Sequence, residues 1–245
     1  MGVLVLGATA GMVASALHKW AQTGEKLYLV GRQPDKLQAI ASDLKIRYGA
    51  SVETYVLDVD ELASIGRWWE NFLANGPVFE KALIAWGYLG DEDRARKEDA
   101  EVEAIIRRNY TAVVLAAGRI AAYLAERGKG VLGIISSVAG VRGRAKNYHY
   151  GSAKAALIAY ASGLRAYYWE KGVRVVTILP GFVDTPMVAG LDLPRPLVTS
   201  AERAGHLIHR AMQKAPAVVY VPAYWRWIML IIRLLPEGIF RRLRN

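Results

Sequence analysis

The sequence predicts an α/β fold in which a doubly wound parallel sheet is flanked by helices on both faces. Short apolar runs alternate with longer amphipathic segments along most of the chain, and the first run ends in the glycine-rich turn GATAG. Such alternation is typical of a parallel sheet whose strands are buried on both faces. No linker rich in Pro, Gly or Ser divides the 245 residues. We therefore expect a single domain over residues 1–222, continued by an apolar and basic helical extension at 223–245.

Strands and helices are expected to alternate from the first residues onward. The run GVLVLG, residues 2–7, is too short for a core helix and leads into a helix that ends near Gln22. Pro34 suits the first turn of the next helix. The same patterns predict strands at 26–32, 51–60, 81–87, 130–136 and 173–179, and helices at 34–49, 61–75, 101–126 and about 148–170. The run DEDRARKEDAE at 91–101 mixes acidic and basic residues, which predicts a solvated loop and helix start.

The residues best suited to catalysis lie between Ser136 and Lys154. Tyr150 and Lys154 are four residues apart, so on a helix they share one face. An ammonium beside a phenol favours the phenolate, and we expect it to lower the Tyr150 pKa towards the working range. Ser137 follows the apolar run VLGII and is placed to hydrogen-bond a carbonyl oxygen that Tyr150 protonates. Because none of these groups can deliver a hydride, a redox cofactor is required.

The turn GATAG is the expected site of that cofactor. Gly7 and Gly11 let the backbone approach a pyrophosphate at a helix N-terminus, although an ordinary strand–helix turn contains the same glycines. The second strand ends in Gly31 and Arg32, where NAD-binding proteins commonly carry an acid. A guanidinium there favours NADP(H) over NAD(H), unless Arg32 only covers the sheet edge in solvent.

Three other polar residues are candidates for the same site. Asp58 follows the third strand and either contacts the adenine or caps the next helix. Asn109 lies among apolar residues of a helix, where it either supports a relay to Lys154 or makes a structural hydrogen bond. Thr185, in the turn PGFVDT, is placed to bond a nicotinamide amide.

The chain resembles the classical short-chain dehydrogenase/reductases over nearly its whole length, on motifs that occur in family order: GATAG (7–11), Asp58, Asn109, Ser137, YGSAK (150–154) and PGFVDT (180–185). The resemblance implies a Rossmann-type fold and an NAD(P)-dependent oxidoreductase that interconverts a secondary alcohol and a ketone. It implies oxyanion and substrate binding by Ser137, proton transfer by Tyr150, and ribose binding and pKa modification by Lys154. Asn109 is then a catalytic residue that supports a proton relay.

The same resemblance implies a set of cofactor-binding residues, which comprises Gly7, Thr9, Ala10, Gly11, Met12, Arg32, Asp58, Val59, Ala85, Trp86, Gly87, Tyr150, Lys154, Pro180, Gly181, Val183 and Thr185. Three positions depart from the family pattern. Val13 replaces the third glycine, Leu6 replaces a threonine, and Ala85-Trp86-Gly87 replaces the usual Asn-Ala-Gly. We therefore expect the packing of the cofactor to be less standard than the catalytic centre.

The segment RGR followed by NYHYGSAKA resembles, more narrowly, the decaprenylphosphoryl-2-keto-ribose reductase group. This resemblance implies a polyprenyl-phosphate-linked keto sugar as substrate, with Arg142, Arg144 and Asn147 on the substrate side. The alternative for these residues is a solvated basic loop. Two other functions stay open: an oxidoreductase for another lipophilic ketone, steroid-like or acyl, and a scaffold that binds NADP(H) without chemistry.

Composition narrows the expected partners and compartment. The net charge of +10 suits phosphates or acidic lipid, and the absence of a nucleic-acid-binding motif argues against nucleic acid. The sequence has no cysteine, which excludes disulfides and thiolate metal sites, and no metal is expected. The N-terminal apolar stretch carries turn glycines and no preceding basic region, so it is not expected to be a signal peptide. The expected location is the cytoplasm.

The tail between Trp225 and Leu235 is apolar but much shorter than the about 20 residues that span a bilayer. Arg226 and Arg233 are seven residues apart and share a helical face, which leaves a wide apolar surface edged by Trp225 and Trp227. We expect this surface to lie in a membrane interface as a peripheral contact, to cover the substrate cleft, or to pack in a homodimer or homotetramer.

Overall fold

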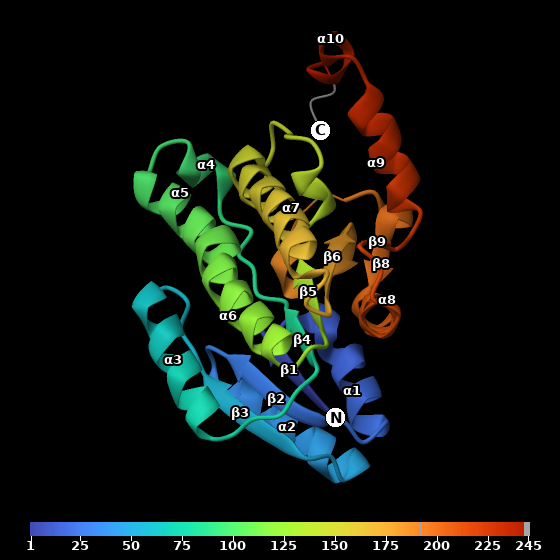
Figure 1. Cartoon of the computed structure of the whole chain (residues 1–245). Helices are drawn as coiled ribbons and strands as arrows, with labels where there is room; N and C mark the ends of the chain where they lie inside the picture. Colours follow the sequence, from blue (N-terminus) through green and yellow to red (C-terminus); the bar gives the residue numbers. More distant parts are fainter. Residues whose placement is uncertain (192, 243–245) are drawn as a thin grey trace.

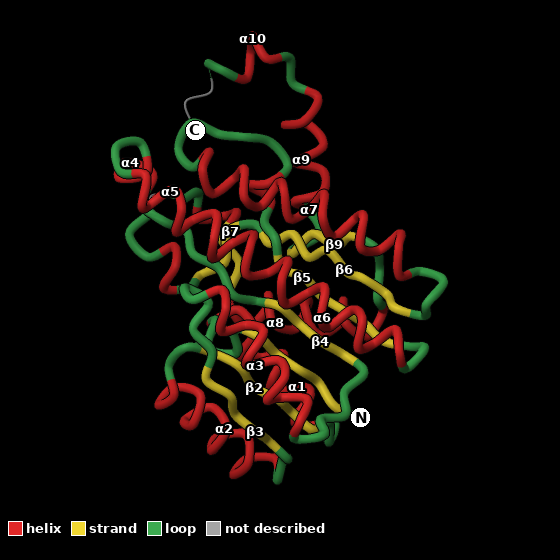
Figure 2. Tube along the Cα trace, turned by 60° about the vertical axis from the view of Figure 1, so that its left-hand side comes forward, coloured by secondary structure: helices red, strands yellow, loops and turns green. Residues whose placement is uncertain are grey.

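A computed structural model describes residues 1–191 and 193–242 of the chain. Its main sheet has the strand order β3-β2-β1-β4-β5-β6-β9, and every neighbouring pair is parallel. Figure 2 shows these strands in yellow, following one another across the molecule. The strands are β1 (Gly2–Leu6), β2 (Lys26–Gly31), β3 (Val52–Val56), β4 (Lys81–Ile84), β5 (Gly130–Ile135), β6 (Val173–Pro180) and β9 (Val218–Val221). Because the chain leaves β1 on one side and returns on the other, the carboxyl ends of β1 and β4 border a crevice.

Helices cover both faces of this sheet. Successive residues of a strand point to opposite faces, so Val3 and Val5 of β1 join one buried cluster, while Leu4 and Leu6 join another. The first cluster is completed by α1 (Ala14–Gln22), α2 (Pro34–Tyr48) and α8 (Ala201–Lys214). The second is completed by α3 (Leu62–Ala74), α6 (Ala112–Glu126) and α7 (Tyr148–Tyr168), on the opposite side of the sheet (Figure 1). The predicted doubly wound α/β fold is confirmed.

The charged run at 91–101 differs from its prediction. It forms α4 (Glu92–Ala95) and the start of α5 (Asp99–Ile106), and the side chain of Glu101 is buried. The Glu101 carboxylate accepts hydrogen bonds from the Tyr88 hydroxyl at 2.7 Å and from the Asp91 amide at 2.9 Å, which offset the loss of water. The prediction of a solvated segment is therefore wrong at Glu101. The helix predicted at 101–126 is also divided, because a π-helical turn, Arg107–Thr111, separates α5 from α6.

The end of the chain forms an arm beside the sheet. After a small parallel pair, β7 (Phe182–Asp184) with β8 (Val198–Ser200), and after α8 and β9, the chain enters α9 (Trp225–Leu234) and α10 (Glu237–Phe240), which project from the body in Figure 1. The last three residues of the expected extension lie outside the described residues. No helix within the described ranges has the length and apolar character needed to cross a membrane.

The base of this arm is fixed by the packing of Trp225 against Gly181. Trp225 is buried, and its ring lies 5.2 Å from that of Phe182 between centroids. A Cβ on Gly181 would lie 1.8 Å from the Trp225 Nε1 atom, so only glycine allows the indole to pack there. The expectation that Trp225 borders an exposed surface is therefore wrong, because it belongs to a buried cluster with Val138, Leu179 and Met229.

Candidate active site

The segment between β5 and α7 brings Ser137, Tyr150 and Lys154 to one region. Ser137 follows the buried end of β5, and its hydroxyl accepts a hydrogen bond from the Ala139 amide at 3.1 Å. Tyr150 and Lys154 lie in α7 and are 9% and 2% exposed. A Cβ on Gly140 would meet the Lys154 carbonyl carbon at 2.6 Å, so glycine lets the loop close against α7. The predicted grouping of these three side chains is thus present in the fold.

Burial controls the protonation of this group. Burial raises the pKa of Tyr150 to about 12, and a hydrogen bond with the Ser137 hydroxyl only partly opposes that change. Burial also lowers the pKa of Lys154 to about 8. The Lys154 Nζ atom lies 5.6 Å from the centre of the Tyr150 ring, and the expected lowering of the Tyr150 pKa by this ammonium is wrong. At neutral pH the phenol is therefore protonated and able to donate a proton.

Asn109 lies in the π-helical turn and is fully buried. Its Nδ2 atom donates to the carbonyl oxygens of Tyr88 at 2.6 Å and Ile105 at 2.9 Å, while its Oδ1 atom accepts from the Tyr88 amide at 3.1 Å. These bonds fix the chain that follows β4. A Cβ on Gly87 would lie 3.3 Å from Asn109 Oδ1 and 3.4 Å from Lys154 Nζ, so the strand end passes close to both side chains. The structural hydrogen bond that the sequence left open is present, and a π turn is often found at a functional site.

A cleft of about 240 Å³ opens at the carboxyl ends of β1, β2 and β4. Eight predicted cofactor-binding residues line it: Gly7, Thr9, Ala10, Arg32, Val59, Ala85, Trp86 and Gly87. Gly31, which was named as the end of the second strand, also lines the cleft, together with residues that sequence reasoning missed: Val30, Gln33, Leu57, Tyr88, Arg108 and Met187. The only sequence signal for a role of Arg108 in the cleft was its position next to Asn109. Gly11, Met12, Pro180, Gly181, Val183 and Thr185 do not line this part of the crevice.

The first turn of the cleft has the form of an anion cradle. Gly7 has a φ of +80°, and a Cβ there would lie 2.6 Å from the Trp86 amide nitrogen, so glycine is required. Within the described residues, the amides of Gly11 and Met12 have no acceptor and no side chain caps this helix start. Free amides and the helix dipole together favour a phosphate group. Thr185 faces the same turn, because a Cβ on Gly11 would lie 3.5 Å from its Cγ2 atom.

Two arginines give the far end of the cleft a positive charge. Arg108 binds Asp60 through two hydrogen bonds, of 2.5 and 2.7 Å, and this pairing lowers the Asp60 pKa. The Arg32 guanidinium is 3.7 Å from the same carboxylate, and its side chain is more than half exposed. The Asp60 carboxylate thus faces two guanidinium groups. Arg108 binds both of its oxygens. Arg32 keeps donors free for an anion.

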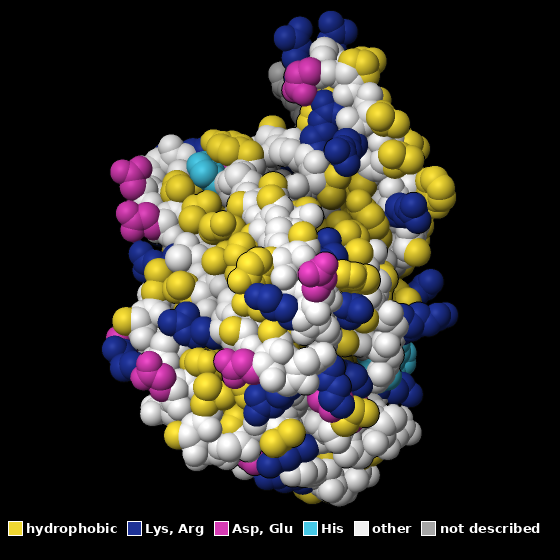
Figure 3. Space-filling model, in the orientation of Figure 1, with side chains coloured by type: hydrophobic (Ala, Val, Ile, Leu, Met, Phe, Trp, Pro, Cys, Tyr) yellow, Lys and Arg dark blue, Asp and Glu magenta, His cyan; other side chains and the backbone are white. Residues whose placement is uncertain are grey.

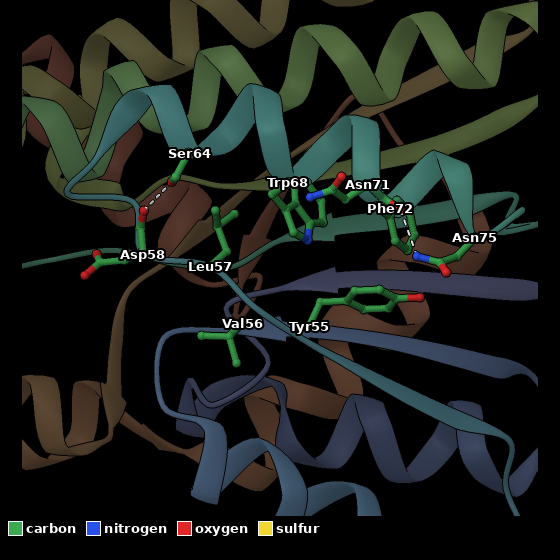
Figure 4. A pocket seen from close by; sticks show the side chains of 9 residues that line it. All are labelled: Tyr55, Val56, Leu57, Asp58, Ser64, Trp68, Asn71, Phe72 and Asn75. Atoms are coloured by element: carbon green, nitrogen blue, oxygen red, sulfur yellow. Dashed lines mark hydrogen bonds between the residues drawn. The ribbon is translucent and has the colours of Figure 1, made fainter.

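Asp58 belongs to a different hollow, which lies between β3 and α3 and has a volume of about 350 Å³ (Figure 4). Its Oδ1 atom accepts a hydrogen bond from the Asp60 amide at 3.0 Å, and its carbonyl oxygen accepts one from the Ser64 hydroxyl at 2.7 Å. Asp58 is not among the residues that line the cofactor cleft. Its two hydrogen bonds instead shape the turn that leads into α3.

The comparisons with known proteins decide the family. The model of the short chain dehydrogenase family matches residues 2–195. The chain belongs to the short-chain dehydrogenase family. An uncharacterized oxidoreductase of Mycobacterium tuberculosis is 34% identical over 241 residues, which cover 98% of this chain and 96% of that protein. A 3-oxoacyl-(acyl-carrier-protein) reductase of Chlamydia trachomatis is 26% identical over 189 residues, which cover 77% and 76%.

A solved structure supports the same fold. The short-chain dehydrogenase from Sphingobium yanoikuyae in complex with NADPH superposes with a TM-score of 0.83 over 96% of each chain, at 24% identity. The present chain is therefore an oxidoreductase of the short-chain dehydrogenase family, a family whose fold binds NAD(P). Its glycine turn and free helix amides fit a dinucleotide pyrophosphate.

Arg142 and Arg144, both expected on the substrate side of this dehydrogenase, make different contacts in the loop after Ser137. Arg142 donates to the carbonyl oxygens of Ile232 and Leu235 at the end of α9, at 2.5 and 2.7 Å, and pairs with Glu237 at 2.8 Å. Its donors are thus used to hold the arm. Arg144 differs, because its Nη2 atom lies 3.4 Å from the Met229 sulfur and burial lowers its pKa.

Arg144 has no carboxylate partner among the described residues. Nearby in the sequence, the Asn147 Oδ1 atom is buried and also lacks a hydrogen-bond partner within the described chain. A partly buried cation and an unpaired amide oxygen are unfavourable unless a ligand satisfies them. Of the three predicted substrate residues, Arg144 and Asn147 therefore keep the capacity to bind a ligand.

Proposed function

We propose that this short-chain dehydrogenase is an NADP(H)-dependent enzyme that interconverts a secondary alcohol and a ketone, with Ser137, Tyr150 and Lys154 as catalytic residues. The observation that carries the proposal is the buried, protonated Tyr150 phenol with Lys154 one helical turn away. Gly87 connects this centre to the cleft, because it lines the cleft and also passes beside Lys154 and Asn109.

In the reducing direction each side chain has one task. When bound in the cleft, NADPH would supply the hydride, with its electron pair, that the carbonyl carbon accepts. The Tyr150 hydroxyl donates its proton to the carbonyl oxygen, which becomes the alcohol hydroxyl, and Ser137 donates a hydrogen bond to the same oxygen as negative charge develops. Lys154, with a pKa of about 8, is mostly charged at pH 7 and stabilises the phenolate that remains. Asn109 positions the strand end at Gly87.

The preference for NADP(H) rests on the far end of the cleft. Arg32 is free to bind a 2′-phosphate, while Arg108 neutralises the nearby Asp60, so the local charge stays positive. The pyrophosphate is assigned to the turn at Gly7–Met12, and Thr185 with the preceding PGFVD segment to the nicotinamide side. The residues on that side are the ones that the resemblance implied: Pro180, Gly181, Val183 and Thr185.

The substrate is proposed to be a lipophilic ketone with an anionic or strongly polar group. Among the described residues Arg144 has no anionic partner and the Asn147 amide oxygen has no hydrogen-bond donor, while the α9 side of the loop is apolar. A polyprenyl-phosphate-linked keto sugar satisfies this description. The similarity to a 3-oxoacyl-(acyl-carrier-protein) reductase favours a second candidate, an acyl ketone attached to a carrier protein.

A Tyr150→Phe variant tests the catalytic assignment. With NADPH and a panel of lipid-linked keto sugars, soluble keto sugars and acyl ketones, loss of the general acid should lower turnover about 1000-fold for whichever substrate the wild type reduces. NADPH affinity, measured by calorimetry, should change less than twofold. Tyr148→Phe is the matched control on the same helix, since Tyr148 is exposed and should be dispensable. Near-native turnover by Tyr150→Phe would refute the assignment.

A further inference from the structure

Helix α9 is apolar on two opposite faces. The inner face carries Trp225 and Met229, which are buried against the body of the protein. The outer face carries an apolar stripe, which we define as Trp227, Leu230, Ile231 and Leu234, with exposures of 63%, 45%, 64% and 73%. The spacing of these four residues, at i, i+3, i+4 and i+7, places them on one side of the helix. Nothing in the described chain covers this stripe.

Basic residues line one side of the stripe and the segment beyond its end. Arg226, Arg233, Arg241 and Arg242 are all exposed. The only acid between residues 223 and 242 is Glu237, and it is paired with Arg142. Figure 3 shows hydrophobic side chains along the outward edge of the arm and Lys or Arg atoms at its tip. An apolar stripe whose exposed charged neighbours are arginines, with no carboxylate partner among the described residues, suits a partner that is both apolar and anionic.

We propose that the outer stripe of α9 docks on the interface of a lipid bilayer that contains acidic lipids. Ten residues of helix are about 15 Å long, which is enough to lie along the interface but not to cross it. The helix is held in place before it meets the lipid, because Arg142 binds its last carbonyl oxygens and Trp225 anchors its first turn. A helix that is already folded loses little conformational entropy when it binds.

A second copy of the chain fits this surface less well. A two-fold contact through α9 would place the arginine-rich faces of both copies against each other, and like charges at an interface oppose association. Four partly exposed side chains also offer much less than the about 800 Å² per partner that a stable interface buries. Charge complementarity therefore favours acidic lipid over self-association.

The inner face of the same helix connects docking to the candidate active site. Met229 contacts Arg144, and it shares a buried cluster with Val138, the residue after Ser137. A protein docked through the outer stripe would thus hold its substrate loop next to the bilayer surface. The docking itself does not depend on the catalytic roles proposed above, and lipid binding can be measured without any substrate.

Liposome flotation of the full chain tests the proposal. Vesicles of phosphatidylcholine with 30% phosphatidylglycerol should carry the wild type upward, and pure phosphatidylcholine vesicles should carry at least tenfold less. Ile231→Ser/Leu234→Ser should lower binding to the acidic vesicles at least tenfold, because two apolar groups leave the interface. Arg233→Gln should lower it about fivefold at low salt, and less at high salt as charge is screened.

A matched control separates a specific stripe from general surface hydrophobicity. Ile46→Ser in α2 removes an isoleucine that is 84% exposed and far from α9 in the sequence, and it should float like the wild type. Thermal unfolding should be unchanged in all variants, since every altered side chain is exposed. The proposal is overturned if the wild type does not float with acidic vesicles, or if the stripe variant floats equally well. It is also overturned if the stripe variant instead dissociates an oligomer in size-exclusion chromatography.

Discussion

Replacing Lys154 by methionine should make the protein more stable while removing its activity. Lys154 is 2% exposed, and no carboxylate among the described residues pairs with it. Its one hydrogen bond within the described chain, from Nζ to the Ile135 carbonyl oxygen, is 3.4 Å long. An unpaired buried ammonium is unfavourable, and methionine fills nearly the same volume without a charge. We therefore interpret Lys154 as a charge kept in the core for function.

The pKa sets the size of the expected effect. A lysine whose pKa falls from 10.5 to about 8 on folding favours its neutral form by about 3 kcal/mol. Losing the long hydrogen bond costs under about 1 kcal/mol. At pH 7, Lys154→Met should thus raise the free energy of unfolding by about 2 kcal/mol. Between about pH 8 and 10.5 only the unfolded wild type still binds the proton, so wild-type stability rises with pH there and the advantage of the variant shrinks.

Urea denaturation at pH 7 and pH 10 measures both parts of this prediction. Lys81→Met is the matched control, because Lys81 is also largely buried but pairs with Glu25 and hydrogen-bonds Gln213 at 3.1 Å. Removing Lys81 leaves the Glu25 carboxylate without its cation and should destabilise the protein by about 3 kcal/mol or more. A Lys154→Met variant that is less stable than the wild type at pH 7, with no dependence on pH, would refute the reasoning.

Three other measurements test the site and the arm. Arg32→Ala should raise the KM for NADPH about tenfold and leave that for NADH within twofold, and an equal rise in both would contradict the 2′-phosphate role. In a urea titration, Gly181→Ala should lower the free energy of unfolding by about 1–3 kcal/mol, because the added Cβ collides with Trp225. The control Gly163→Ala, at an open position in α7, should raise the free energy of unfolding by about 0.5–1 kcal/mol. The kcat/KM for reduction should fall above about pH 8 as Lys154 loses its proton, while Tyr150, with a pKa of about 12, stays protonated; a profile flat to pH 10 would argue against Lys154.

The fold could be predicted because its signals are local. The apolar runs became strands with shifts of a few residues at their ends, and the helix expected from Pro34 to residue 49 ends at Tyr48, with Gly49 in the left-handed conformation. Gly7 was predicted from the turn GATAG directly after the first strand, and its φ of +80° is a backbone conformation that favours glycine. The π-helical turn at Arg107–Thr111 has no comparable local signal, so one continuous helix was expected there.

The errors concern burial and partners that are distant in the sequence. Glu101 stands in a run of alternating charges, yet its carboxylate is buried by a tyrosine hydroxyl and an amide from the segment after β4. The Tyr150 pKa was predicted from its neighbour four residues away, but the loss of water outweighs that neighbour. Sequence spacing gives the proximity of two groups and not their solvation, which depends on the whole fold.

Arg142 and Arg144 illustrate the same limit within one loop. They are two residues apart and look equivalent in the sequence, but Arg142 meets carbonyl oxygens about 90 residues further along the chain. Those contacts use the donors of Arg142, which holds the arm, whereas Arg144 has no anionic partner in the part of the chain that the structure describes. The loop that follows Ser137 thus holds the end of α9 through Arg142 and contacts its inner face through Arg144. A change at Arg142 should therefore act on both the stability of α9 and the shape of the substrate loop.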